Sequence, residues 1–141
     1  VGLDLPIVHV RHEYFVTVHA EGLQPNLPVV RIPDSTLYLR AEINSLLCGG
    51  WEPSALSTDP RNFPIGNEPP PIDPDWDVLG WFAEQLGPEM PQVENLGVRS
   101  VFKGWPTFTP DGRFIVGPSA KVKGFVQPQS WFVDLTAVTV R

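Results

Sequence analysis

The segment Leu5 to Val18 most constrains the fold, because it alternates like a long β-strand and places an imidazole and a phenol among valines. One face carries Val8, Val10, His12, Tyr14, Val16 and Val18. The other carries Ile7, His9, Arg11, Glu13, Phe15 and Thr17. We expect the valine-rich face to be the core face. Because buried polar groups need hydrogen-bond partners, His12 and Tyr14 either bond each other and nearby backbone within the core or face a pocket.

The composition is typical of one folded domain. Of 141 residues, 42% are hydrophobic and 18% are charged. A net charge of -6 without a basic cluster makes nucleic acid and anionic membranes unexpected partners. No apolar run approaches the roughly 18 residues of a membrane span. A single cysteine, Cys48, is typical of a reducing compartment. Since the chain begins at Val1, we expect it to be a piece of a longer protein.

The pattern predicts an α+β fold, mostly antiparallel or mixed β-sheet with one or two helices. Short strands are expected at Val29 to Ile32, Thr36 to Ala41 and Ser45 to Gly49, as a meander. Further strands are expected at Val98 to Phe102, Arg113 to Val116, Gly124 to Val126 and Trp131 to Val140. The proline-rich stretch 59–74 predicts a surface loop, either a linker or a segment that docks a partner.

One helix is expected at Asp75 to Leu86, with Asp73 or Asp75 as its N-cap. Its apolar residues recur at helical spacing on one face. We expect its aromatic residues to pack against a sheet rather than to form a ligand cage; they are Trp76, Trp81 and Phe82.

Few motifs point to chemistry directly. His9 and His12 point to opposite faces of a strand, so a metal site is not expected. Cys48 lies in an apolar strand end, which predicts an inert buried thiol. Gly49 and Gly50 indicate only a strand terminus, and neither a Gly-x-Gly-x-x-Gly nor a Walker loop is present. The remaining candidates for a cavity lining are His12, Tyr14, Trp51, Glu52 and the segment Thr107 to Asp111.

Seven short segments in order resemble the flavin-dependent sarcosine and dimethylglycine dehydrogenase family, which also includes the regulatory subunit of pyruvate dehydrogenase phosphatase. They are Val1-Gly2-Leu3 with Pro6, His12-x-Tyr14-x-Val16-Thr17, Tyr38-Leu39-Arg40-x-Glu42, Leu46-Leu47-x-Gly49-Gly50-Trp51-Glu52, Gly97-Val98-x-Ser100, Pro106-x-Phe108-Thr109-Pro110-Asp111, and Gly117 with Gly124-Phe125.

The resemblance implies a fold like that of D-amino-acid oxidase. Residues 1–126 would form its substrate-binding region, without the Rossmann portion that holds FAD, and residues 127–141 would form a divergent C-terminal strand. The substrate would be a small methylated amine such as sarcosine or dimethylglycine, oxidised by hydride transfer to FAD. The mitochondrial matrix and the bacterial cytoplasm are both compatible. We do not expect this chain by itself to bind flavin or turn over substrate.

The resemblance also implies roles for single residues. His12 would be the catalytic residue that orients or deprotonates the amine. Tyr14, Trp51 and Arg40 would contact the substrate, although an Arg40 to Glu42 contact is the structural alternative for that arginine. Thr109 and Asp111 would lie at the flavin end of the cavity. The alternatives are a non-catalytic interaction protein on the same fold, like the phosphatase regulatory subunit, and a truncated product with an altered C-terminal strand.

Overall fold

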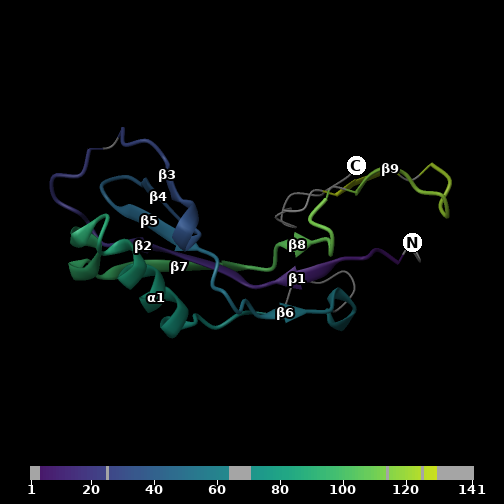
Figure 1. Ribbon diagram of the computed structural model, residues 1–141, viewed down its shortest axis with the longest axis horizontal. Coiled ribbons are helices and arrows are strands. Elements are labelled where there is room, and N and C mark those ends of the chain that lie inside the picture. Colours follow the sequence, from purple (N-terminus) through teal and green to yellow (C-terminus); the bar gives the residue numbers. More distant parts are fainter. Residues whose placement is uncertain (1–3, 25, 64–70, 114, 125, 130–141) are drawn as a thin grey trace. The chain divides into compact units, whose positions relative to one another are not determined.

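A computed structural model describes residues 4–24, 26–63, 71–113, 115–124 and 126–129 (Figure 1). The chain divides into two compact units. Unit 1 comprises Val1–Arg11, Leu56–Pro71 and Gly104–Arg141, and unit 2 comprises His12–Ala55 and Ile72–Lys103. The predicted final strand, Trp131 to Val140, lies outside the described residues.

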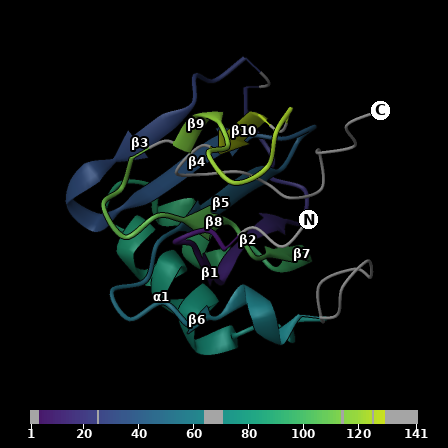
Figure 2. The same ribbon diagram turned by 90° about the vertical axis from the view of Figure 1, so that its right-hand side faces the viewer.

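Unit 2 is built on a five-stranded sheet with the order β3-β4-β5-β2-β7, which can be followed in Figure 2. The strands are β2 (His12–Thr17), β3 (Val30–Ile32), β4 (Leu37–Ala41), β5 (Leu46–Gly50) and β7 (Val98–Gly104). Neighbours β3 and β4, β4 and β5, and β5 and β2 pair antiparallel. The predicted meander is therefore confirmed. A 3-10 helix, η1 (Pro33–Ser35), joins β3 to β4.

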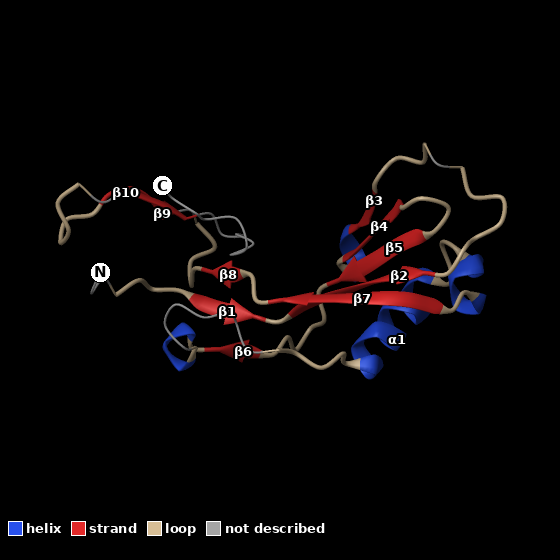
Figure 3. Ribbon diagram, turned by 180° about the vertical axis from the view of Figure 1, so that it is seen from behind, coloured by secondary structure: helices blue, strands red, loops and turns tan. Residues whose placement is uncertain are grey.

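The helix α1 (Trp76–Leu86) lies against one face of this sheet, as Figure 3 shows in blue, and confirms the predicted helix. Asp75 is its N-cap: the carboxylate Oδ1 accepts a hydrogen bond from Val78 N at 3.2 Å. Asp75 N in turn donates to Glu13 Oε2 at 3.0 Å. The buried Glu13 carboxylate thus ties the start of α1 to β2. A further 3-10 helix, η3 (Pro91–Asn95), packs next to α1.

The sequence offered Asp73 and Asp75 as N-caps of α1, and the stabilities of their alanine variants can be compared directly. We expect Asp75→Ala to lower the free energy of unfolding by about 1 kcal/mol, because the Val78 N–H loses its acceptor. Asp73→Ala is the matched control, since Asp73 is exposed and precedes the cap. Urea denaturation measures both variants. Equal losses in the two variants would contradict the assignment of Asp75 as the cap.

The core of unit 2 lies between α1 and the sheet face that carries Phe15, and it corrects the predicted core face. Phe15 is 2% exposed, whereas Val18 is 40% exposed. Polar residues of the same face are buried because they have partners: Thr17 Oγ1 accepts a hydrogen bond from Leu46 N at 3.0 Å. The other members of the core are Leu37, Leu39, Leu46, Cys48, Leu79, Phe82, Leu86 and Val93.

Among the aromatic residues of α1, the packing prediction holds for two of three. Phe82 is fully buried, and Trp81 packs against the core cluster. Trp76 was expected to pack as well, but it is the first residue of the helix and is 60% exposed.

Unit 1 contains a three-stranded sheet with the order β6-β1-β8 and a separate antiparallel pair. The strands are β1 (Val8–Val10), β6 (Ser57–Thr58), β8 (Thr107–Phe108), β9 (Ile115–Pro118) and β10 (Val126–Gln129). The predicted single strand Leu5 to Val18 is therefore wrong, because β1 and β2 belong to different sheets. The strands expected at Arg113 to Val116 and Gly124 to Val126 begin two residues later. Within the proline-rich loop, the described residues include the 3-10 helix η2 (Pro60–Asn62).

Candidate functional site

The face of the unit 2 sheet away from α1 brings together the polar aromatic residues of the sequence. In the observed register, Tyr14 and Tyr38 both lie opposite Gly49, one on each side of β5. Because side chains alternate along a strand, the face that carries Tyr14 also carries His12. We call this surface the aromatic face; it comprises His12, Tyr14, Tyr38, Trp51 and Phe102.

His12 has close contacts on two sides. Its Nε2 is 2.8 Å from the Tyr38 hydroxyl, in a hydrogen bond whose donor depends on the imidazole tautomer. Its ring stacks on Trp51, with centroids 4.0 Å apart and planes inclined by 23°. His12 on β2 therefore bonds Tyr38 on β4, at the other side of β5, and not Tyr14 on its own strand. The substrate roles predicted for His12 and Tyr14 stay predictions.

Burial keeps both members of this hydrogen bond neutral. It lowers the pKa of His12 to about 4, and a backbone hydrogen bond with Gly50 offsets part of that effect. Burial also raises the pKa of Tyr38 well above its usual range, with the nearby Tyr14 adding to the rise. At physiological pH the aromatic face therefore presents a neutral imidazole and a protonated phenol.

A second aromatic pair lies beside the first. Tyr14 and Phe102 stack with centroids 5.0 Å apart and planes inclined by 14°. Phe102 is 48% exposed, so this part of the face can contact another molecule. Tyr14 thus lies where the sequence predicted it, on the same face as His12.

Arg40 lies on the same sheet face but forms an ion pair. Its Nη2 is 2.8 Å from Glu42 Oε2, and the Arg40 side chain is 52% exposed. The contact with Glu42 that the sequence offered as the structural alternative is therefore present. A substrate carboxylate would have to compete with Glu42 for this guanidinium.

Thr109 and Asp111, the residues predicted at the flavin end, belong to unit 1. The Thr109 hydroxyl donates to Arg113 O at 2.8 Å, and Asp111 Oδ1 accepts from Arg113 N at 3.1 Å. Gly112 completes the turn with a φ of 64° and a hydrogen bond from its N–H to Thr109 O. These polar groups therefore shape the loop itself. Their cofactor role stays a prediction.

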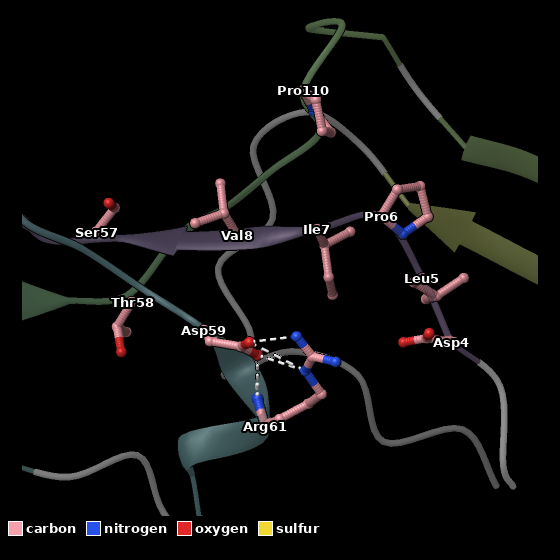
Figure 4. Close-up of a pocket in the computed structure, with 10 residues that line it drawn as sticks. All are labelled: Asp4, Leu5, Pro6, Ile7, Val8, Ser57, Thr58, Asp59, Arg61 and Pro110. Carbon is pink, nitrogen blue, oxygen red and sulfur yellow. Dashed lines mark hydrogen bonds and ion pairs between the residues drawn. The ribbon is translucent and has the colours of Figure 1, made fainter.

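Unit 1 also contains a hollow of about 770 Å³ along β1 (Figure 4). Its described lining includes Leu5, Pro6 and Ile7 from the start of the chain, and Pro110. Figure 4 shows the Arg61 guanidinium reaching the Asp59 carboxylate, with Nε 2.9 Å from Oδ1. Pro110 belongs to the segment Thr107 to Asp111 that was predicted to line a cavity, whereas no residue of the aromatic face is in the described lining.

Other classes of site find no support in the described residues. They contain no group of three or more histidine, cysteine or acidic side chains placed to hold a metal ion. None of their helices has the length and hydropathy to cross a bilayer. Cys48 is fully buried, and burial raises the pKa of its thiol to about 12, which confirms the prediction of an inert thiol.

The structure brings His12, Tyr14 and Trp51 together as predicted, and it adds Tyr38 and Phe102. In the sequence, Tyr38 appears only in a segment of the family resemblance, without a role at the site. The available signal is the short spacing between the strands expected at Thr36 to Ala41 and Ser45 to Gly49, which the structure joins by a tight turn in which Glu42 and Ser45 exchange backbone hydrogen bonds. Such a tight turn fixes the register that sets Tyr38 opposite Gly49.

Comparison with known proteins gives relatives over most of the chain, although no protein-family model matches it. Mitochondrial sarcosine dehydrogenase of Mus musculus is 33% identical over 126 residues, covering 88% of this chain and 13% of that protein. Mitochondrial pyruvate dehydrogenase phosphatase regulatory subunit of Mus musculus is 31% identical, with 87% and 14% covered. Mitochondrial dimethylglycine dehydrogenase of Mus musculus is 28% identical, with 89% and 15% covered. The chain thus spans about one seventh of the length of these relatives.

Proposed function

Because this chain matches the sarcosine and dimethylglycine dehydrogenase family over 88% of its length, we propose that it forms the substrate-binding wall of a flavin-dependent N-methyl amine oxidoreductase. The observation that carries the proposal is the aromatic face, on which a half-buried, neutral imidazole contacts a phenol and an indole. The reaction class is taken from the relatives, and the aromatic face is a surface suited to the substrate of that reaction.

An N-methylated amine fits this surface chemically. Aromatic rings attract methylated ammonium groups through their negative faces, and Trp is the strongest of them. The Trp51 indole and the exposed Phe102 ring lie on the same sheet face. A small amine lying there would be surrounded by apolar carbon and would have the His12 and Tyr38 pair as its polar contact.

The low pKa of His12 supports one of the two roles considered for it. An alkyl amine such as the lysine side chain has a pKa of about 10, roughly six units above that of His12. Moving a proton from such an ammonium to His12 would cost about 8 kcal/mol. His12 therefore acts by fixing the Tyr38 hydroxyl, whose oxygen is the polar contact for the amine, rather than by deprotonating the amine; its own ring nitrogens already bond Tyr38 and the Gly50 backbone. The apolar surroundings favour the neutral amine, the form that can give up a hydride.

The described residues fit the substrate and do not fit a dinucleotide. The sequence lacks a glycine-rich phosphate loop, and Thr109 and Asp111 use their polar atoms within their own turn. Flavin chemistry would supply a hydride acceptor, held by a Rossmann portion outside this sequence. The role of this chain is to bind and orient the amine. The relatives include mitochondrial proteins and one from the bacterium Paenarthrobacter nicotinovorans, which supports a location in the mitochondrial matrix or the bacterial cytoplasm.

The test compares variants of the complete gene product that contains this chain. With sarcosine or dimethylglycine and an artificial electron acceptor, we expect His12→Gln to lower kcat/KM by about 100-fold, as the loss of an orienting contact does. The matched control is His19→Gln, since His19 is an exposed histidine just beyond β2. Full activity in the His12 variant would overturn the proposed role of this face.

A second function has one observation in its favour, the 31% identity to the phosphatase regulatory subunit. On that alternative the same fold would serve a partner protein rather than an amine. The same experiment distinguishes the two, because a parent protein that purifies colourless, ignores added FAD and oxidises no methylated amine would support the regulatory function.

A further inference from the structure

The backbone of Gly49 lies directly beneath the two tyrosines of the aromatic face. A Cβ atom added at Gly49 would lie 2.6 Å from the Tyr38 hydroxyl oxygen and 2.7 Å from Tyr38 Cζ. It would also lie 2.7 Å from Tyr14 Cβ. Real Cβ atoms essentially never approach other atoms within 3.0 Å. Gly49 is not among the glycines with positive φ, so the requirement for glycine here comes from space and not from backbone conformation.

The neighbouring Gly50 has a different role on the opposite face. A Cβ there would meet the side chains of Leu37 and Phe82, which belong to the core beneath α1. The two glycines therefore serve two surfaces: Gly50 lets α1 approach the sheet, and Gly49 leaves room on the aromatic face. The prediction that this pair marks a strand terminus is confirmed, because β5 ends at Gly50, and the structure adds a packing role for each glycine.

We infer that Gly49 is a positioning residue of the amine site: the missing side chain lets the Tyr38 ring lie flat across β5, so that its hydroxyl reaches His12. The Tyr38 contacts at Gly49 involve the phenol end of the ring, which is the end that bonds His12 Nε2 at 2.8 Å. Any side chain at position 49 takes the space of that hydroxyl. The importance of this arrangement for catalysis rests on the proposed function, whereas the arrangement itself does not.

Nuclear magnetic resonance of the histidine rings in the 141-residue chain tests the inference. In Gly49→Ala the Tyr38 ring moves off His12, which becomes more exposed. We expect the pKa of His12 to rise by at least one unit toward its ordinary value, a tenfold change in its protonation equilibrium. Gly80→Ala is the control, because the structure describes nothing within 4 Å of a Cβ at Gly80, and it should leave the His12 signals unchanged.

A second measurement separates the effect on Tyr38 from general damage to the sheet. The urea midpoint shift caused by Gly49→Ala is measured in the parent and in a Tyr38→Ser background. It should at least halve in that background, since two of the three nearest contacts belong to Tyr38. If Gly49→Ala does not fold but the double variant with Tyr38→Ser does, that result supports the inference equally. Equal midpoint shifts, an unchanged His12 pKa, or failure of both variants to fold would overturn it. None of these measurements involves amine or flavin, so a failed proposed function would leave the result standing.

Discussion

Phe82→Ala is expected to lower the free energy of unfolding by about 3 to 5 kcal/mol, the usual cost of emptying a fully buried aromatic site. Phe82 is the largest fully buried side chain of the described residues, and it lies where α1 meets the sheet at Gly50. Small domains have total stabilities of only about 5 to 15 kcal/mol, so the variant should unfold at a much lower urea concentration. Far-ultraviolet circular dichroism during urea titration measures the change.

The matched control comes from the same helix. Trp76 is also aromatic, but it is 60% exposed, and Trp76→Ala should change the stability by no more than about 0.5 kcal/mol. Comparable losses in the two variants would show that α1 does not bury the side that carries Phe82. Such a result would also remove the reason for the close approach of the helix to Gly50.

Local patterns predicted the helix and the meander because short-range physics determines both. The apolar spacing along Asp75 to Leu86 and the short turns between strands are readable without tertiary information. The choice of core face is a different kind of problem. Which side of β2 is buried depends on where α1 packs, about 60 residues later in the chain. The valine-rich face of the segment Leu5 to Val18 was therefore the wrong choice of core face.

The polar residues of β2 show why composition misleads here. Glu13 is 1% exposed and Thr17 fully buried, and both would normally indicate a solvent face. Their hydrogen-bond partners are the backbone N–H groups of Asp75 and Leu46, which are distant in sequence. A buried polar side chain becomes acceptable once such a partner exists, and local sequence cannot show that it does.

The residues of the candidate site that share one strand were predictable. Those brought together by the register between strands were not. His12 and Tyr14 share a face of β2 by alternation alone. Tyr38 reaches His12 only because the register of β4, β5 and β2 sets Tyr38 and Tyr14 on the two sides of Gly49. The same register sets the glycine pair that ends β5 opposite Leu37 and Tyr38 of β4.

Acidification should destabilise the chain through His12, and this is the second large effect. The pKa of His12 is about 4 in the folded protein and 6.5 when unperturbed, since burial disfavours the imidazolium. As the pH falls below 6.5, the unfolded chain binds a proton that the folded chain does not, and stability is lost until the pH reaches about 4. A difference of about 2.5 units corresponds to roughly 3 kcal/mol over that interval. Burial lowers the pKa of His9 too, which adds a loss of the same sign.

His12→Gln isolates this contribution from that of other titrating groups. The variant loses the contacts of His12 at every pH, so the informative quantity is the change in unfolding free energy between pH 7.5 and pH 4, measured by urea denaturation. We expect that change to be about 3 kcal/mol smaller in His12→Gln than in the parent, because the titrating imidazole is gone while His9 and the carboxylates are common to both. His19→Gln, which replaces an exposed histidine, is the matched control for the substitution itself. If His12→Gln retained the full acid sensitivity, His12 would have to be solvated in the folded state, and the neutral imidazole on which the orienting role depends would be lost with it.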